Sequence, residues 1–422
     1  MLSFGGGRRT HAQREPVPLD PERLTAARAY ITGYWKNLQR HQTLDSGSLI
    51  GLPKPYLVPS ANQESEFDYE ELYYWDSYFM VQGLLDESHR ALVLGILEDL
   101  TYLFERFGII PNASRLYFTS RTQPPFLTSF IFDAYDVYKL DTDWLDTKMH
   151  IAEKEYDWVW MGTRKPNVRQ VYQGLSRYYD FNYLHDLAEA ESGWDMTTRF
   201  NRRALDFLPV DLNSLLYKYE TDFARTAQLL GRESEEREWR QKAEARKAAM
   251  DRLMWNEHSG LYFDYDFVQQ KQGAIESLAS FYPLWAGMVD ETRAARLVGS
   301  LARFEEEGGL ATTSAPSFGF HRSGTLPTQW AYPNGWAPLQ FIVVEGLRRY
   351  GYHEYAAHLA RTWLKTNLDW FTAHGVFLEK YNVARPADEP AKGVYPAQTG
   401  FGWTNAIFER FCRDYVDTPT NP

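Results

Sequence analysis

Residues 216–253 read LYKYETDFARTAQLLGRESEEREWRQKAEARKAAMDRL and hold the pattern that decides the fold. Apolar residues recur every three or four positions over 216–230, which predicts one amphipathic helix. Gly231 interrupts the pattern, and a second helical pattern follows at once over 235–253. Two helices joined by so short a turn pack side by side, so the stretch predicts a helical hairpin.

The same rhythm recurs along the chain. Asp20-Pro21-Glu22 is a strong start signal for a helix, and Leu24, Ala27, Ile31, Trp35 and Leu38 then share one face. Further helices are expected over 87–107, closed by Gly108, and around 293–304 and 352–367. Long aromatic and Gly/Pro-rich stretches separate the helices: 42–76, 108–130, 165–200, 308–338 and 372–404. Only Gly260–Asp266 alternates as a short β-hairpin would.

These patterns predict an all-α protein with one domain of paired helices over 20–415 and long loops gathered over one face. Loops of this length in a compact domain usually carry function. Residues 383–396 and 42–66 are rich in Pro, Gly and charge, and we expect both to act as lids over the site. Residues 1–19 are expected to be a disordered leader, because their first part is polar and has no apolar core of a secretion signal.

Bulk composition excludes several classes. The chain has 422 residues, a net charge of −11 and no Lys/Arg-rich block, so neither nucleic acid nor a membrane is an expected partner. Cys412 is the single cysteine, which favours a reducing cytoplasm. A homo-oligomer stays open as an option.

Aromatic residues make up 16% of the chain and include 14 Trp and 28 Tyr. Many stand in polar clusters such as Tyr73-Tyr74-Trp75-Asp76. Rings that stack on sugar faces beside polar groups would explain this, and so would a helical core filled with Tyr and Trp. Composition does not choose between these two interpretations.

Catalytic chemistry is left to carboxylates. The sequence has no phosphate-binding Gly-rich loop, His-Glu-x-x-His pair, Cys cluster or Gly-x-Ser-x-Gly turn, so neither a metal nor a cofactor is predicted. Asp195 follows Ser192-Gly193-Trp194, where desolvation beside Trp would suit a general acid. It could equally cap a helix, and Glu379 could be an ordinary surface Glu. Spacing alone does not separate either from the other acids.

Seven sequence motifs favour the catalytic interpretation of Asp195 and Glu379. They are Tyr73–Tyr78, Ile110–Pro125, Glu191–Arg199, Pro209–Leu216, Gln329–Pro338, Glu379–Asn382 and Gln398–Asn405. In this order they resemble the motifs of trehalases, over about residues 65–410. The chain is therefore similar to the clan of inverting (α/α)6-barrel glycosidases that includes trehalases and glycoside hydrolase family 63.

This resemblance implies an (α/α)6 barrel of six helical hairpins that hydrolyses an α-glycoside with inversion, without metal or cofactor. It implies that Asp195 is the general acid and Glu379 the general base that activates water. The substrate-binding residues expected on this basis are Tyr69, Tyr73, Trp75, Asp76, Asn112, Arg121, Gln123, Gly193, Trp194, Gln329, Trp330, Gln398 and Trp403.

Four departures from the trehalase pattern guide the substrate prediction. They are Asp68 for Arg, Ala331 for Asp, Val394 for Glu, and Ser176–Asp180 for an Arg-Pro-x-Glu-Ser segment. Because they remove groups that trehalases use on the second glucose, the chain resembles the mannosylglycerate and glucosylglycerate hydrolases of family 63 more closely. We therefore expect cleavage of 2-O-α-mannosyl-D-glycerate, with the glucosyl analogue as an option.

A small pocket for the glycerate carboxylate is expected with this substrate. The candidates to bind the carboxylate are Arg121, Arg177, Tyr178, Tyr179, Tyr69 and Tyr73. Trehalase activity is the first alternative. From other classes, a sugar epimerase working through histidines and a non-catalytic sugar-binding barrel are the rivals.

Overall fold

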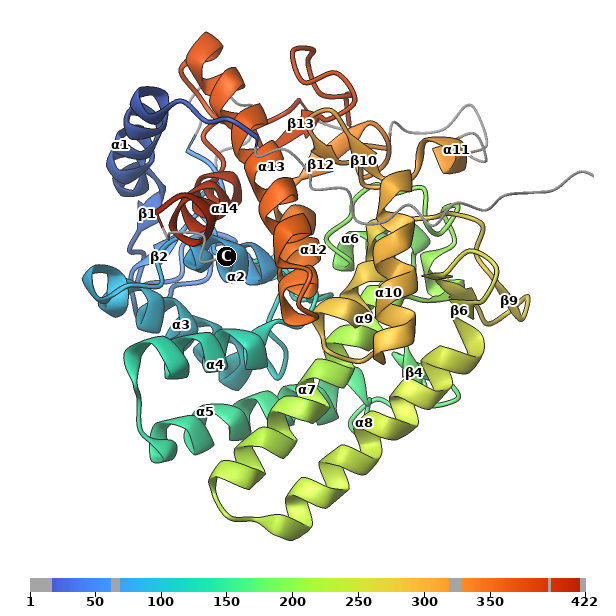
Figure 1. The fold of residues 1–422 in the computed structure, drawn as a ribbon. Coiled ribbons are helices and arrows are strands. Elements are labelled where there is room, and N and C mark those ends of the chain that lie inside the picture. The colour runs from blue at the N-terminus through green and yellow to red at the C-terminus, as the bar shows by residue number, and fades with distance from the viewer. Residues whose placement is uncertain (1–16, 62–68, 319–327, 394–395, 418–422) are drawn as a thin grey trace, which may run out of the picture.

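The computed structural model describes residues 17–61, 69–318, 328–393 and 396–417, and helices dominate them (Figure 1). The α-helices are α1 (Pro21–Leu38), α2 (Tyr74–Gln82), α3 (Arg90–Phe107), α4 (Leu127–Tyr138), α5 (Thr142–Glu155), α6 (His185–Glu191), α7 (Val210–Leu229), α8 (Glu233–Leu253), α9 (Tyr282–Trp285), α10 (Glu291–Ser300), α11 (Ala315–Phe318), α12 (Ala337–Arg349), α13 (His353–His374) and α14 (Gly402–Cys412). The predicted leader lies outside the described residues as far as residue 16.

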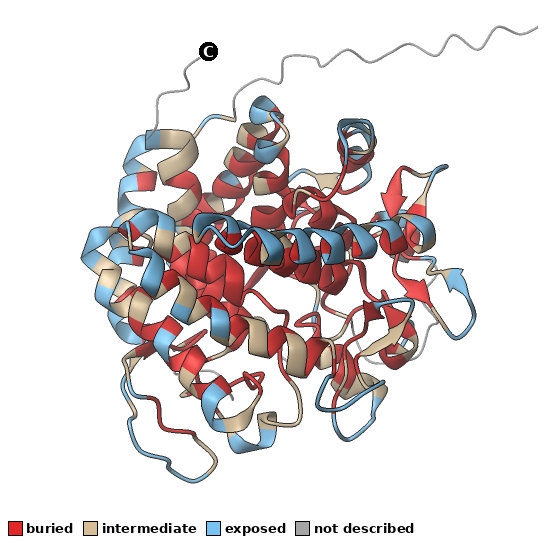
Figure 2. Ribbon diagram, turned by 90° about the horizontal axis from the view of Figure 1, so that it is seen from below, coloured by how far each residue is buried: buried red, intermediate tan, exposed pale blue. Residues whose placement is uncertain are grey.

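Two concentric layers of helices form the barrel. Helices α2, α4, α7, α9, α12 and α14 make the inner layer, where consecutive members contact one another in the order α2–α14–α12–α9–α7–α4. Every residue of α2 is buried, whereas outer helices such as α8 bury one stripe and expose the rest, as Figure 2 shows. This arrangement confirms the predicted (α/α)6 barrel.

Local signals explain the helix ends. The Asp20 carboxylate accepts hydrogen bonds from the backbone N–H groups of Glu22 and Arg23, and Pro21 opens α1. The predicted face of α1 is the buried one. Gly108 closes α3 with φ at 70°, a conformation that favours glycine. The predicted hairpin of 216–253 is α7 and α8, although α7 begins earlier, at Val210.

Short strands lie in the loops. They are β1 (Gln39–Arg40), β2 (Tyr56–Leu57), β3 (Gln170–Tyr172), β4 (Leu175–Ser176), β5 (Phe207–Leu208), β6 (Trp255–Asn256), β7 (Leu261–Tyr262), β8 (Tyr265–Asp266), β9 (Lys271–Gln272), β10 (Glu305–Glu306), β11 (Gly309–Leu310), β12 (Asn334–Trp336) and β13 (Lys380–Asn382). The hairpin predicted over 260–266 was wrong, because β7 pairs with β6 whereas β8 lies between β5 and β9. The antiparallel pair β12–β13 sets Trp336 opposite Lys380.

No helix among the described ranges combines the length and the apolar character needed to cross a bilayer.

Candidate active site

A cavity of about 430 Å³ opens where the inner helices begin. Such a volume lies within the range of small-molecule sites. Most of the predicted site residues line it: Tyr69, Tyr73, Trp75, Asp76, Asn112, Arg121, Gln123, Gly193, Asp195, Trp330, Glu379 and Trp403. Residues that are far apart in sequence therefore meet in one pocket.

The other three predicted residues lie behind the pocket wall. Trp194 is fully buried and stacks on Trp330, with 5.5 Å between ring centroids. Gln329 is fully buried and contacts the backbone of the Asp195 loop. Gln398 accepts a hydrogen bond from the Glu379 N–H through its backbone carbonyl. Each of the three contacts a residue that lines the pocket.

The carboxyl of Asp195 has a strongly raised pKa. Its pKa is raised to about 7, mainly by burial and also by the nearby Glu379 charge, while a backbone hydrogen bond and the charges of Arg121 and Lys380 act in the opposite direction. The Gln329 amide donates a hydrogen bond to the backbone carbonyl of Asp195 at 2.6 Å. Near pH 7 this carboxyl is therefore protonated in a large fraction of molecules, which is the state that a general acid needs.

Glu379 has a different environment. Its Oε2 accepts a hydrogen bond from the Lys380 ammonium at 3.0 Å, and both side chains are almost fully buried. Lys380 also donates to Oε1 of Gln329 at 2.9 Å. The Trp403 indole N–H donates to the backbone carbonyl of Glu379 at 3.0 Å. Glu379 is thus held in place through both its side chain and its backbone.

Tryptophans form the wall between the two carboxyl loops. The ring of Trp330 stacks on Trp336 at 3.8 Å and lies 5.6 Å from Trp75. Trp75 in turn meets Trp403 edge to face at 5.9 Å. The backbone N–H of Trp330 donates to the carbonyl of Met196, next to Asp195. Stacked indoles of this kind fix the loops in place and present apolar faces to a sugar.

Gly193 is required by its surroundings. Its φ of 73° lies in the left-handed region, and a Cβ at this position would come within 2.6 Å of the Trp75 indole. Only glycine allows the turn before Asp195 to approach Trp75 so closely.

Asp76 is a second pocket carboxyl that favours its neutral form. Its pKa is raised to about 8, mainly by burial and also by the charges of Glu379 and Asp195, while hydrogen bonds from the backbone and from Gln123 oppose the shift. Because Asp76 and Asp195 are both shifted, the pKa alone does not say which of them is the acid.

The remaining predicted polar residues are fixed by short contacts. Arg121 Nη1 lies 3.2 Å from the buried carboxylate of Asp180. The Asn112 amide donates to a backbone carbonyl at 3.1 Å, and Gln123 Oε1 accepts from the Trp75 N–H at 2.9 Å. Such fixed donors and acceptors suit recognition of sugar hydroxyls.

Sequence reasoning missed part of the pocket. The Arg115 guanidinium donates to Glu71 at 2.8 Å, and Tyr73 donates to the same carboxylate at 3.0 Å. Arg121 lies over the ring of Phe118, 5.0 Å from its centroid. The other missed lining residues are Pro59, Tyr117, Ala190 and Phe401. Except for Pro59, which belongs to the predicted lid over 42–66, their only signal was that they lie in or next to the quoted motifs.

The lid segments contribute little to the described pocket. Pro59 is the one residue of the described part of 42–66 that lines it, and no described residue of 383–396 does. Instead Ala391 exchanges two hydrogen bonds with the Asn334 side chain, at 2.9 and 3.1 Å. Closure of either segment stays a prediction.

Two carboxyls in unlike environments, beside indole faces and fixed polar groups, equip the pocket for acid–base hydrolysis of a glycoside. The histidine-based epimerase alternative has no support here, since no histidine is found among the described lining residues.

Comparison with known proteins identifies the family. The family model described as Trehalase matches residues 13–182 and 179–415. The chain belongs to the trehalase family. This membership confirms the predicted class, a glycoside hydrolase.

Several relatives are named trehalases. The chain is similar to the cytosolic neutral trehalase of Neurospora crassa, at 33% identity over 84% of this chain and 57% of the relative. A cytosolic neutral trehalase of Pyricularia oryzae is 32% identical over 94% of this chain and 65% of the relative. The chain thus spans about three fifths of the length of these curated relatives.

Solved structures agree on the fold. Neutral trehalase Nth1 from Saccharomyces cerevisiae is similar with a TM-score of 0.75 and 28% identity, over 92% of this chain and 79% of that one. The GH63 mannosylglycerate hydrolase from Thermus thermophilus, in complex with glucose, has a TM-score of 0.67 and 19% identity over 92% of this chain and all of that one. The second likeness is one of fold alone.

These findings correct the substrate prediction. The mannosylglycerate hydrolase prediction was wrong, because neutral trehalases match most of the chain at 32–33% identity. Ala331 is fully buried and does not line the active-site pocket, so its size says nothing about a second sugar, and Asp68 and Val394 lie outside the described residues.

Only half of the six candidates for the carboxylate site lie in the pocket: Arg121, Tyr69 and Tyr73 line it, whereas Arg177, Tyr178 and Tyr179 do not. Arg177 binds the backbone carbonyls of Val168 and Leu205. Tyr178 is buried and donates to Asp211. Neither residue lines the pocket, and neither does Tyr179.

Proposed function

We propose that this protein hydrolyses α,α-trehalose to two molecules of glucose, with inversion at the attacked carbon. The observation that carries the proposal is the meeting of Asp195 and Glu379 in one pocket of a chain that belongs to the trehalase family. Relatives of 32–33% identity are named neutral trehalases, which supports the choice of substrate.

The proposed mechanism uses the two carboxyls in one step. Protonated Asp195 donates its proton to the glycosidic oxygen as the C–O bond breaks. Glu379 removes a proton from water, and that water attacks the anomeric carbon from the opposite face. The positive charge that develops on the sugar ring lies close to the carboxylates of the pocket.

Neighbouring residues have proposed roles as well. Neutral Asp76, with its raised pKa, can donate a hydrogen bond to a sugar hydroxyl. The indoles of Trp75 and Trp403 supply flat faces for the pyranose ring. The Glu71–Arg115 pair, which also lines the pocket, offers fixed partners for further hydroxyls of the substrate.

We infer the cellular location of the protein from its relatives. The curated relatives from Neurospora crassa, Beauveria bassiana and Pyricularia oryzae are all named cytosolic, which supports the predicted cytoplasmic location.

Two substrates separate the proposed roles. The first is trehalose, whose leaving group needs a proton, and the second is α-glucosyl fluoride, whose leaving group does not. Asp195→Asn should lose at least about 1,000-fold in kcat on trehalose and far less on the fluoride. Glu379→Gln should lose activity on both. Asp143→Asn, at an exposed position near the start of the outer helix α5, is the matched control.

Proton NMR of the nascent products should show β- and α-glucose in equal amounts, because the attacked glucose is inverted and the leaving glucose keeps its α configuration. If Asp195→Asn loses equal activity on both substrates, Asp195 is not the acid, and Asp76→Asn becomes the variant to compare. If wild-type protein releases no glucose from trehalose, the substrate proposal fails.

A further inference from the structure

A second cavity of about 430 Å³ lies at the other end of the inner helices. All six inner helices contribute residues to its lining, whereas only α2 and α14 contribute residues to the active-site pocket. The lining residues are Tyr78, Gln82, Ser129, Phe132, Asp133, Asp136, Lys218, Arg225, Trp285, Phe341, Glu345, Arg348, Arg349 and Arg410. None of them has a part in the mechanism above.

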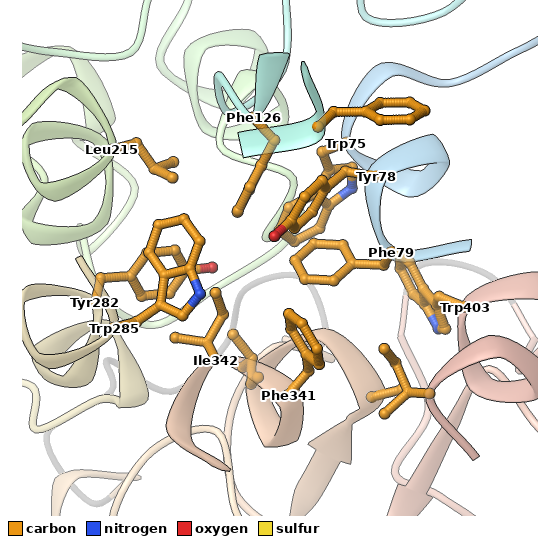
Figure 3. Close-up of a cluster of buried hydrophobic side chains, with 14 of the residues drawn as sticks. Trp75, Tyr78, Phe79, Phe126, Leu215, Tyr282, Trp285, Phe341, Ile342 and Trp403 are labelled. Carbon is orange, nitrogen blue, oxygen red and sulfur yellow. The ribbon is translucent and has the colours of Figure 1, made fainter. Parts of the chain in front are cut away.

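An aromatic layer separates the two cavities. Trp75 and Trp403 face the active-site pocket, whereas Tyr78, Trp285 and Phe341 line the second cavity (Figure 3). Tyr78 stacks on the buried ring of Phe126 at 4.5 Å, and Trp285 lies 5.6 Å from that same ring. The second cavity is therefore a separate space with aromatic faces in its wall.

Polar groups in this cavity have unmet hydrogen-bonding capacity. Oε1 of Glu345 is buried and accepts no hydrogen bond from the described residues, and Nη2 of Arg410 lies 3.9 Å from it. Asp133 accepts a hydrogen bond from Gln82 at 2.8 Å. Burial is the main cause that raises the Asp133 pKa. Carboxyls beside aromatic faces suit the hydroxyls and C–H faces of a sugar.

Arginines line the same cavity. Arg225 pairs with Asp136 at 3.0 Å, and Arg348 pairs with Glu345. Arg349 is exposed, and its guanidinium forms no hydrogen bond or ion pair with any residue in the described ranges. Guanidinium groups are the preferred partners of phosphate.

The fold explains only part of this cluster. Because the inner helices end toward this cavity, their partial negative charge favours nearby cations. Lys218 and Arg410 are in addition bound by Asp222 and Asp414. Helix ends do not account for the open volume, the aromatic wall or the buried Glu345 oxygen without a donor.

We propose that this cavity binds a phosphorylated sugar. The sugar would lie against Tyr78 and Trp285 and donate a hydroxyl to Glu345. The phosphate would accept hydrogen bonds from the guanidinium groups of Arg349 and Arg225. The site is independent of the proposed trehalose hydrolysis, because it shares no lining residue with the active-site pocket.

Calorimetric titration tests the proposal with three probes: glucose 6-phosphate, glucose and inorganic phosphate. Glucose 6-phosphate should bind the wild-type protein at least about tenfold more tightly than either of the others, since each half alone loses the contacts of the other. The double variant Arg225→Ala/Arg349→Ala should weaken it by about tenfold or more. Arg237→Ala, at an exposed arginine of α8, should leave binding unchanged.

Both arginines of the double variant are largely exposed, so the fold should persist, and unchanged trehalose hydrolysis in a separate assay checks this. Equal affinity for glucose 6-phosphate and for either single probe would refute a site for a phosphorylated sugar. So would binding that survives the double variant, because the ligand would then occupy another place. Absence of binding by all three probes would also overturn the proposal.

Discussion

Replacing Asp195 by Asn should remove catalysis and, at the same time, stabilise the fold. In the folded protein, burial raises the pKa of this carboxyl from an ordinary 3.8 to about 7. One pKa unit corresponds to about 1.36 kcal/mol. Keeping the carboxylate charged above pH 7 therefore costs the folded state up to about 4 kcal/mol. Because the pocket is open to water, we expect about half of this, ~2 kcal/mol.

The sign of the effect depends on pH. Below pH 3.8 the carboxyl is protonated in the folded and the unfolded chain, so the substitution gives no advantage. As pH rises toward 7 the unfolded chain binds fewer protons than the folded one, and wild-type stability falls. The advantage of the Asp195→Asn variant therefore grows from about pH 4 and is complete above about pH 7.

Differential scanning calorimetry at pH 4.5 and pH 8 measures this. Unfolding entropy of about 2.1 cal/mol/K per residue gives ~0.9 kcal/mol/K for this chain, so 2 kcal/mol is roughly a 2 °C rise in Tm. Asp143→Asn is the control, since its carboxyl is exposed. A Tm difference for Asp195→Asn that is the same at both pH values would refute burial as the source of the raised pKa.

Three further predictions concern the same pocket. First, kcat/KM on trehalose should fall as pH rises through about 7, with a slope of one proton, because Asp195 loses the proton it donates; a flat profile to pH 9 would contradict this. Second, Gly193→Ala should lower kcat/KM by at least about tenfold, because its new Cβ would clash with the Trp75 indole. Gly174→Ala is the control, since Gly174 also has a positive φ, of 80°, but has open space around it, so this variant has the backbone strain without the clash. Equal activity of the two variants would exclude the clash. Third, Lys380→Met should lower kcat by about 10- to 100-fold by removing the hydrogen bond to Glu379, as measured by glucose release.

Helices were readable from the sequence because their signals are local. The cap at Asp20 and the apolar face of α1 are set within a few residues, and the structure matches both. The same holds for Gly108 at the end of α3. The barrel itself came from the resemblance, since periodicity alone predicts paired helices without saying how many close into a ring.

The site was only partly readable. Motif resemblance picked out Asp195 and Glu379, which spacing alone could not separate from other acids. The Glu71–Arg115 pair had no sequence signal of its own, because its partners lie 44 positions apart and meet only in the fold. Substitutions such as Ala331 misled the substrate prediction, since burial behind the pocket wall cannot be seen in a sequence.

One side chain links the two proposed catalytic carboxyls. Gln329 donates its amide hydrogen to the Asp195 backbone and accepts a hydrogen bond from Lys380, the residue that binds the Glu379 carboxylate. Its burial leaves no water to replace either contact. The acid loop before α7 and the base loop before α14 are therefore positioned against each other by the Gln329 motif, whose own role in the sequence looked like sugar binding. An acid and a base must keep a fixed distance while a bond breaks between them. A residue that supports both of their loops is therefore a physical reason for the Gln329 motif to occur together with the Asp195 and Glu379 motifs.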